Sequence, residues 1–142
     1  MGKRSVPLTA AFVLALFAQV LASDSLKIAV FSVDASPAIG SPLAYDPTKE
    51  VTLPLSCRGV VLIGQGQPIV LCSIDWIGVA NESHKAFRRI LADAVGTTPD
   101  RVAVHAIHQH DAPRCDFSVD ELLTPYGIAG QFFDSPFARD VM

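Results

Sequence analysis

The chain has 142 residues, of which half are apolar and 18% are charged, and its formal net charge is −3. This composition excludes an intrinsically disordered chain, which combines low apolar content with high net charge. It also argues against a nucleic-acid-binding protein, because no stretch holds more than two consecutive basic residues to neutralise phosphates.

Residues 1–22 have the pattern of a secretory signal peptide. Lys3 and Arg4 form a basic start, residues 6–22 are almost wholly apolar, and the run ends on Ala22 before a polar segment. A membrane anchor is the alternative, since the run is barely long enough to span a bilayer. The small residues at its end favour cleavage, so we expect a secreted or periplasmic protein.

The next part of the chain predicts strands. Residues 26–33 alternate and are rich in β-branched side chains, which predicts a strand, and a loop dense in proline and glycine follows up to Tyr45. Two apolar runs, 57–63 and 68–75, flank a glycine-rich turn and predict a β-hairpin. Both runs are apolar at consecutive positions, so we expect both faces of the sheet to be covered.

Three cysteines, Cys57, Cys72 and Cys115, are an odd number for an oxidising compartment, and none has the spacing of a zinc cluster. Cys57 and Cys72 oppose each other across the hairpin if its turn centres on Gly64-Gln65. A turn one residue later sets them diagonally. A disulfide and a pair of buried free thiols are both open for these two residues.

The clearest helix is predicted over residues 81–95, where Asn81 is suited to cap the N-terminus and Gly96 to end the helix. A strand follows over residues 102–107. Beyond it the pattern weakens, and only a short helix is indicated, beginning at residues 120–123. The order strand, hairpin, helix, strand predicts an α/β fold, a layered sheet with a flanking helix.

Two histidines at the end of the last strand are the best candidates for chemistry. His108 and His110 lie two positions apart, so their imidazoles point to the same face if the backbone stays extended. Neutral imidazoles on one side can share a divalent cation, and the C-terminal ends of strands are where α/β sheets bind ligands. A catalytic zinc needs three protein ligands, and the chain offers two. We expect His84 and His105 to be structural.

Three aspartates are candidates to support this site. Asp111 is placed to orient an imidazole through a hydrogen bond, and capping of the following turn is its alternative. Asp34 and Asp75 each end a predicted strand and can approach the histidines, although aspartates at strand ends commonly bond to loop amides. No nucleophile elbow of the Gly-x-Ser-x-Gly kind and no phosphate-binding glycine loop is present.

Three segments resemble the N-terminal part of the neutral/alkaline ceramidase family, exported zinc amidases that cleave N-acylsphingosine. Residues 34–45 (DASPAIGSPLAY) are similar to the family's opening Asp-x-Thr-Pro-Pro-x-Gly loop and its nearby Gly-Tyr. Residues 70–75 (VLCSID) resemble its strand ending in aspartate, and residues 107–113 (IHQHDAP) resemble its Thr-His-Thr-His-Ser-Gly-Pro motif. Order and spacing agree over residues 26–117.

The resemblance implies that His108 is a zinc ligand. It also implies that His110 lies beside the metal and assists the substrate or the transition state. His110 is in addition a candidate zinc ligand. The implied reaction is attack by a water molecule, activated by Zn²⁺, on the amide carbonyl of a lipid-like N-acyl substrate. Such a substrate can be reached at a membrane surface.

The family's remaining ligands, a histidine, a glutamate and a tyrosine, have no counterpart in this chain. We therefore expect residues 23–142 to be the N-terminal portion of a larger, truncated catalytic domain that alone binds zinc weakly and turns over little. The chain departs from the family at Asp111, where the family has serine, and at Arg114, where it continues with glycine.

Two other functions remain open from the sequence. An amidohydrolase-type barrel also carries a His-x-His after a strand, but there the motif closes the first strand, whereas here a hairpin and a helix precede it. A non-catalytic periplasmic metal-binding or interaction domain is the alternative outside the enzymes.

Overall fold

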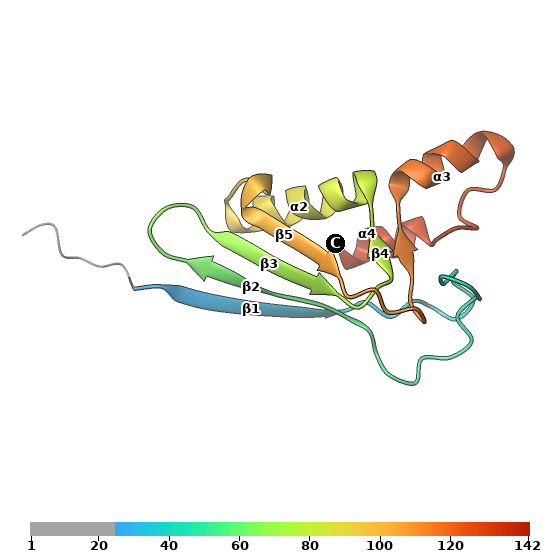
Figure 1. Ribbon diagram of the computed structural model, residues 1–142, viewed down its shortest axis with the longest axis horizontal. Coiled ribbons are helices and arrows are strands. Elements are labelled where there is room, and N and C mark those ends of the chain that lie inside the picture. The colour runs from blue at the N-terminus through green and yellow to red at the C-terminus, as the bar shows by residue number, and fades with distance from the viewer. Residues whose placement is uncertain (1–24) are drawn as a thin grey trace, which may run out of the picture.

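The computed structural model describes residues 25–142, so the expected signal peptide at residues 1–22 lies outside the described residues (Figure 1). Its main sheet has the strand order β1-β2-β3-β5. The strands are β1 (Lys27–Asp34), β2 (Ser56–Ile63), β3 (Ile69–Ile74) and β5 (Val102–Ala106). β2 pairs antiparallel with both β1 and β3, and β5 joins β3 in parallel. This mixed sheet with flanking helices confirms the α/β layered fold.

The remaining elements connect and cover the sheet. They are β4 (Gly78–Val79), α2 (Asn81–Val95), a 3-10 turn (Pro99–Arg101), β6 (Arg114–Cys115), α3 (Phe117–Leu123), a second 3-10 turn (Thr124–Tyr126) and α4 (Ser135–Val141). Helix α2 is the crossover between the parallel strands β3 and β5, and β4 pairs in parallel with β6. Among residues 25–142 no helix has the length and apolarity that a bilayer crossing requires.

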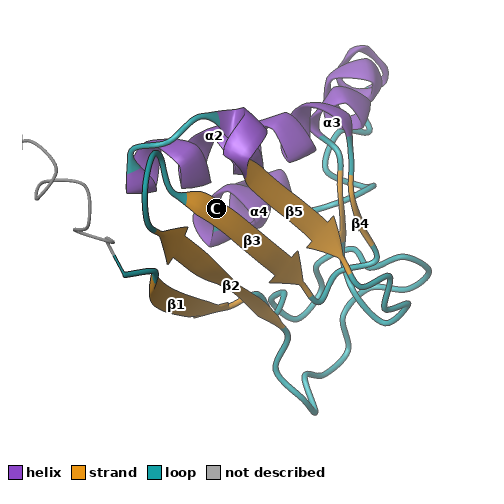
Figure 2. Ribbon diagram, turned by 60° about the vertical axis from the view of Figure 1, so that its left-hand side comes forward, coloured by secondary structure: helices purple, strands orange, loops and turns teal. Residues whose placement is uncertain are grey.

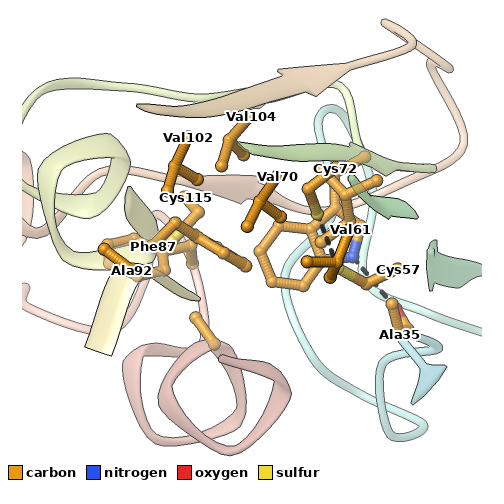
Figure 3. Packing of buried hydrophobic residues seen from close by; sticks show 14 residues of the cluster. Ala35, Cys57, Val61, Val70, Cys72, Phe87, Ala92, Val102, Val104 and Cys115 are labelled. Atoms are coloured by element: carbon orange, nitrogen blue, oxygen red, sulfur yellow. Dashed lines mark hydrogen bonds between the residues drawn. The ribbon is translucent and has the colours of Figure 1, made fainter. Parts of the chain in front are cut away.

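Trp76 is the centre of the core. Its side chain is fully buried, and its indole Nε1 donates to the carbonyl of Ala35 at 2.9 Å. The ring packs edge-on against Phe87 of α2 at 6.2 Å between centroids, and it lies tilted against Phe137 of α4 at 5.7 Å. Figure 3 shows the surrounding cluster of buried side chains. Both helices therefore cover the same face of the sheet.

The opposite face of the sheet carries no helix in the described part of the chain, so the expectation that both faces are covered is wrong there (Figure 2). Pairing places Ile28 and Val30 of β1 and Leu71 of β3 on this face, and they are 62%, 78% and 46% exposed. A consecutive apolar run indicates burial on both sides. Here only one face of the sheet is buried against the hydrophobic core. We call the other face the open face.

Helix α2 spans the predicted residues, but its N-terminus is built differently from the expectation. The capping position is Ala80, and no side chain caps it, so the prediction that Asn81 caps the helix is wrong. Asn81 lies within the first turn at a φ of +45°, and its amide Nδ2 donates to the carboxylate of Asp116 at 2.6 Å. Gly96 ends the helix in the left-handed conformation at a φ of +69°, as predicted.

The hairpin register places Cys57 and Cys72 diagonally, the second of the two alternatives. Cys57 pairs with Ile74 and Cys72 with Gly59, and the two sulfur atoms are 3.5 Å apart as free thiols. Cys115 is also free and buried. Desolvation raises the pKa of Cys115 to about 11, so its thiolate is scarce at neutral pH.

The C-terminal part holds more structure than the sequence indicates. Helix α3 begins three residues before the predicted start, because Asp116 accepts from the N–H of Ser118 at 3.0 Å and caps it. Asp134 caps α4 in the same manner, by accepting from the N–H of Phe137 at 3.0 Å. The strands β4 and β6 have two residues each, too few for a hydrophobic period to register.

Gly59 of β2 provides a test of the core-side packing. A Cβ at this position would lie 2.5 Å from both the carbonyl oxygen of Leu71 and the ring of Phe31. We expect Gly59→Ala to lower the free energy of unfolding by about 1–3 kcal/mol, measured by urea denaturation. The added methyl group forces the backbone at Leu71 and the ring of Phe31 to move away from Gly59. Gly78→Ala is the matched control, since nothing lies within 4 Å of its added Cβ. Equal effects of the two substitutions would contradict this packing.

Candidate functional site

The backbone turns sharply at His108, just beyond the end of β5 at Ala106. His108 has a φ of +64°, in the left-handed region that residues other than glycine seldom adopt. Its N–H donates to the carbonyl of Trp76 at 3.1 Å, and the N–H of Ile107 donates to that of Ile74 at 3.1 Å. The extended backbone assumed from the sequence is therefore wrong here, and the end of β3 holds the turn.

The imidazole rings of His108 and His110 nevertheless lie next to each other. The ring centroids of His108 and His110 are 4.9 Å apart, with the ring planes at 81°. Nδ1 of His108 lies 2.8 Å from the carbonyl oxygen of Ile77. A carbonyl can only accept, so Nδ1 carries a proton, and in the neutral imidazole Nε2 then presents a free lone pair. Metal-ligating histidines are held in this way, with one ring nitrogen donating to the protein and the other facing the metal.

His110 has a partner that the sequence analysis did not select. The hydroxyl of Tyr45 lies 3.2 Å from Nδ1 of His110, and the two ring centroids are 5.7 Å apart. The residues are 65 positions apart, and no local pattern joins them. The sequence signals for Tyr45 are its place at the end of the proline- and glycine-rich loop and its match to the Gly-Tyr of the resembled family.

The backbone around Ala44 sets the position of Tyr45. The N–H of Ala44 donates to the carbonyl of Ala112 at 3.2 Å, and its carbonyl accepts from the guanidinium of Arg114. The guanidinium also lies over the ring of Phe132, 4.4 Å from its centroid. The segment after the histidines therefore fixes the loop that carries the tyrosine.

A groove of about 670 Å³ lies beside the histidine segment. Gln109 and Asp111 line it, and neither imidazole does. Its volume is in the range of small-molecule sites. The rest of the lining combines apolar and polar residues: Pro37, Leu43, Asp46, Pro47, Thr48, Lys49, Glu50, Val51, Thr52, Leu53, Pro54, Leu55, Asp75 and Ile107.

The structure does not bring the three candidate aspartates into hydrogen-bonding contact with the imidazoles within residues 25–142. Asp34 accepts from the N–H of Ser36 at 2.8 Å. Asp75 accepts from the N–H and hydroxyl of Ser56 at 2.8 and 2.7 Å. Asp111 is exposed beside the groove. Their support of the histidines stays a prediction.

The other two histidines lie away from this pair. His84 is half-buried, and its Nε2 is 3.2 Å from the carbonyl oxygen of Val104. His105 pairs with Ser73 on the open face and is exposed, with no hydrogen bond in the described chain. Across residues 25–142 no three His, Cys, Asp or Glu side chains gather closely enough to hold a metal ion. The candidate site is therefore His108, His110 and Tyr45.

No protein-family model matches the chain, and no curated protein matches it either. The likeness to the neutral ceramidases accordingly stays a prediction from the sequence.

Asp75 generates a prediction about pH. Desolvation alone would raise the pKa of its carboxyl, but hydrogen bonds from Ser56 and the charge of Arg58 outweigh it and hold the pKa below the usual value. A carboxyl with a lowered folded-state pKa contributes stability above the unfolded pKa of about 4 and loses it as the pH falls through the folded pKa. We expect Asp75→Asn to lower the stability of the folded protein at pH 7. The difference in stability from the parent should shrink below pH 4, as measured by thermal unfolding of both proteins at each pH.

The matched control for this measurement is Asp100→Asn. Asp100 forms an ion pair with Arg88 at 3.4 Å, but its side chain is 97% exposed, so the pair contributes little. A difference between Asp75→Asn and the parent that stays constant from pH 7 to pH 3 would contradict the assigned cause.

Proposed function

We propose that the protein is an exported, zinc-dependent hydrolase that cleaves an N-acyl amide bond in a lipid-like substrate, as its resemblance to the neutral ceramidases implies. One observation carries the proposal. Nδ1 of His108 donates to the carbonyl of Ile77, which leaves Nε2 as a free metal-binding atom just beyond the C-terminal end of β5.

The residues present fit part of a zinc site. The imidazole of His108 has the tautomer that a ligand needs, and the ring of His110 lies beside it, 4.9 Å away between centroids. A catalytic zinc takes three protein ligands, so one would come from outside the described residues if His110 binds the metal, and two if it does not. When bound, zinc would polarise the amide carbonyl and lower the pKa of a water molecule.

The surroundings suit a substrate with an aliphatic part. The lining of the groove mixes apolar side chains, among them Leu43, Leu55 and Ile107, with polar ones such as Gln109 and Asp111. Apolar lining residues can contact hydrocarbon, and polar ones can orient the polar head of a ligand. This favours an acyl-chain substrate over a small polar one.

The two alternatives receive less support. In a (β/α)8 barrel the strands are parallel, whereas β2 here pairs antiparallel with both of its neighbours. A non-catalytic metal-binding domain needs the same His108, so only a measurement of turnover separates it from a hydrolase.

We expect His108→Ala to weaken zinc binding by the exported protein at least tenfold, measured by competition with a chelating dye, because the substitution removes the imidazole whose Nε2 lone pair is free for the metal. His105→Ala is the matched control. That histidine is exposed on the open face, and its loss should leave the zinc affinity unchanged.

The same proteins are then assayed for release of fatty acid from an N-acyl lipid presented in mixed micelles. Hydrolysis that requires zinc and is lost in His108→Ala supports the proposal. Zinc binding without hydrolysis overturns the enzyme and favours the metal-binding domain. Equal zinc affinity in the parent and in His108→Ala overturns both.

A further inference from the structure

We propose that Tyr45 and Arg114 are positioning residues that give the two histidines different roles. Arg114 fixes the backbone ahead of Tyr45, and the hydroxyl of Tyr45 donates to Nδ1 of His110 and keeps the proton of that imidazole on Nε2. His108 then offers a lone pair, and His110 offers an N–H. The consequence for catalysis rests on the proposed function, whereas the arrangement of protons does not.

The direction of the hydrogen bond follows from the chemistry of its two partners. The hydroxyl of Tyr45 and Nδ1 of His110 are 3.2 Å apart, and each can donate or accept. A phenol O–H is more acidic than an imidazole N–H, and an imidazole lone pair is a stronger acceptor than a phenol oxygen. The phenol therefore donates, and the proton of neutral His110 stays on Nε2.

The carbonyl of Ile77 imposes the opposite tautomer on His108. Nδ1 of His108 must carry its proton, since a carbonyl has none to give. Neighbouring imidazoles thus present one acceptor and one donor. An Nε2–H beside a metal is suited to stabilise the negative charge that develops on a carbonyl oxygen, and it cannot itself bind the metal.

Arg114 supports the contact between Tyr45 and His110 by holding the backbone, since Tyr45 is not oriented by burial. The tyrosine is 73% exposed, so its direction depends on the backbone that precedes it. The guanidinium of Arg114 donates to the carbonyl of Ala44 and is held over the ring of Phe132. Arg114 belongs to β6, which pairs with β4. A planar guanidinium can bond and stack at once, which a lysine cannot.

The test is the tautomer of each imidazole, read from its ¹⁵N resonances in the full chain without zinc, at a pH where both rings are neutral. In the parent we expect Nδ1–H for His108 and Nε2–H for His110. Tyr45→Phe keeps the ring and removes the donor, so His110 should become a mixture of tautomers while His108 stays unchanged. Arg114→Ala should do the same, and Arg114→Lys should restore part of the parent signature.

His108 is the internal control for folding, because its bond to Ile77 depends on the fold and not on Tyr45. A parent protein with Nδ1–H on His110 overturns the inference, and so does a tautomer of His110 that Tyr45→Phe leaves unchanged. In the active protein, Tyr45→Phe should lower kcat about tenfold or more with unchanged zinc affinity. If the parent and the variants show the expected tautomers but the protein does not bind zinc, the result contradicts the proposed function alone.

Discussion

The candidate site depends on one constraint, the capture of His108 by the segment that follows β3. The carbonyl of Trp76 accepts from the backbone N–H of His108, and the carbonyl of Ile77 accepts from its imidazole. A left-handed backbone at a residue with a Cβ costs on the order of 1 kcal/mol, and these two hydrogen bonds offset it. The same bonds set both the direction of the ring and the nitrogen that is left free. Without them the chain would leave β5 extended, and the imidazole would be free to choose its tautomer.

The core and the site share a residue. Trp76 is packed between α2 and α4 through Phe87 and Phe137, and its indole holds the carbonyl of Ala35, where the loop that leads to Tyr45 begins. One buried side chain therefore anchors both segments that carry the site. Rigid support of this kind is what a constellation of catalytic groups requires, because errors of about 1 Å in position lower rates strongly.

The sequence predicts the regular elements well and their surroundings less well. Helix α2 is strongly periodic and ends on a glycine, so its bounds were predictable, whereas Asn81 is drawn away from capping by Asp116, which is distant in the sequence. The strands were predictable from their apolar runs, but an apolar run does not say which face a helix covers. His108 and His110 stand out by their spacing. Tyr45 does not, because its contact depends on the packing of two loops and on Arg114, which no local pattern links to it.

β1 forms one edge of the sheet and pairs only with β2 in the described chain. Several of its side chains, among them Ile28 and Val30, face solvent, and so does the row of backbone amides and carbonyls along its outer side. Such a ribbon is a template on which other extended chains add by forming backbone hydrogen bonds. We therefore expect the tendency of the purified protein to self-associate through this edge to rise with its concentration.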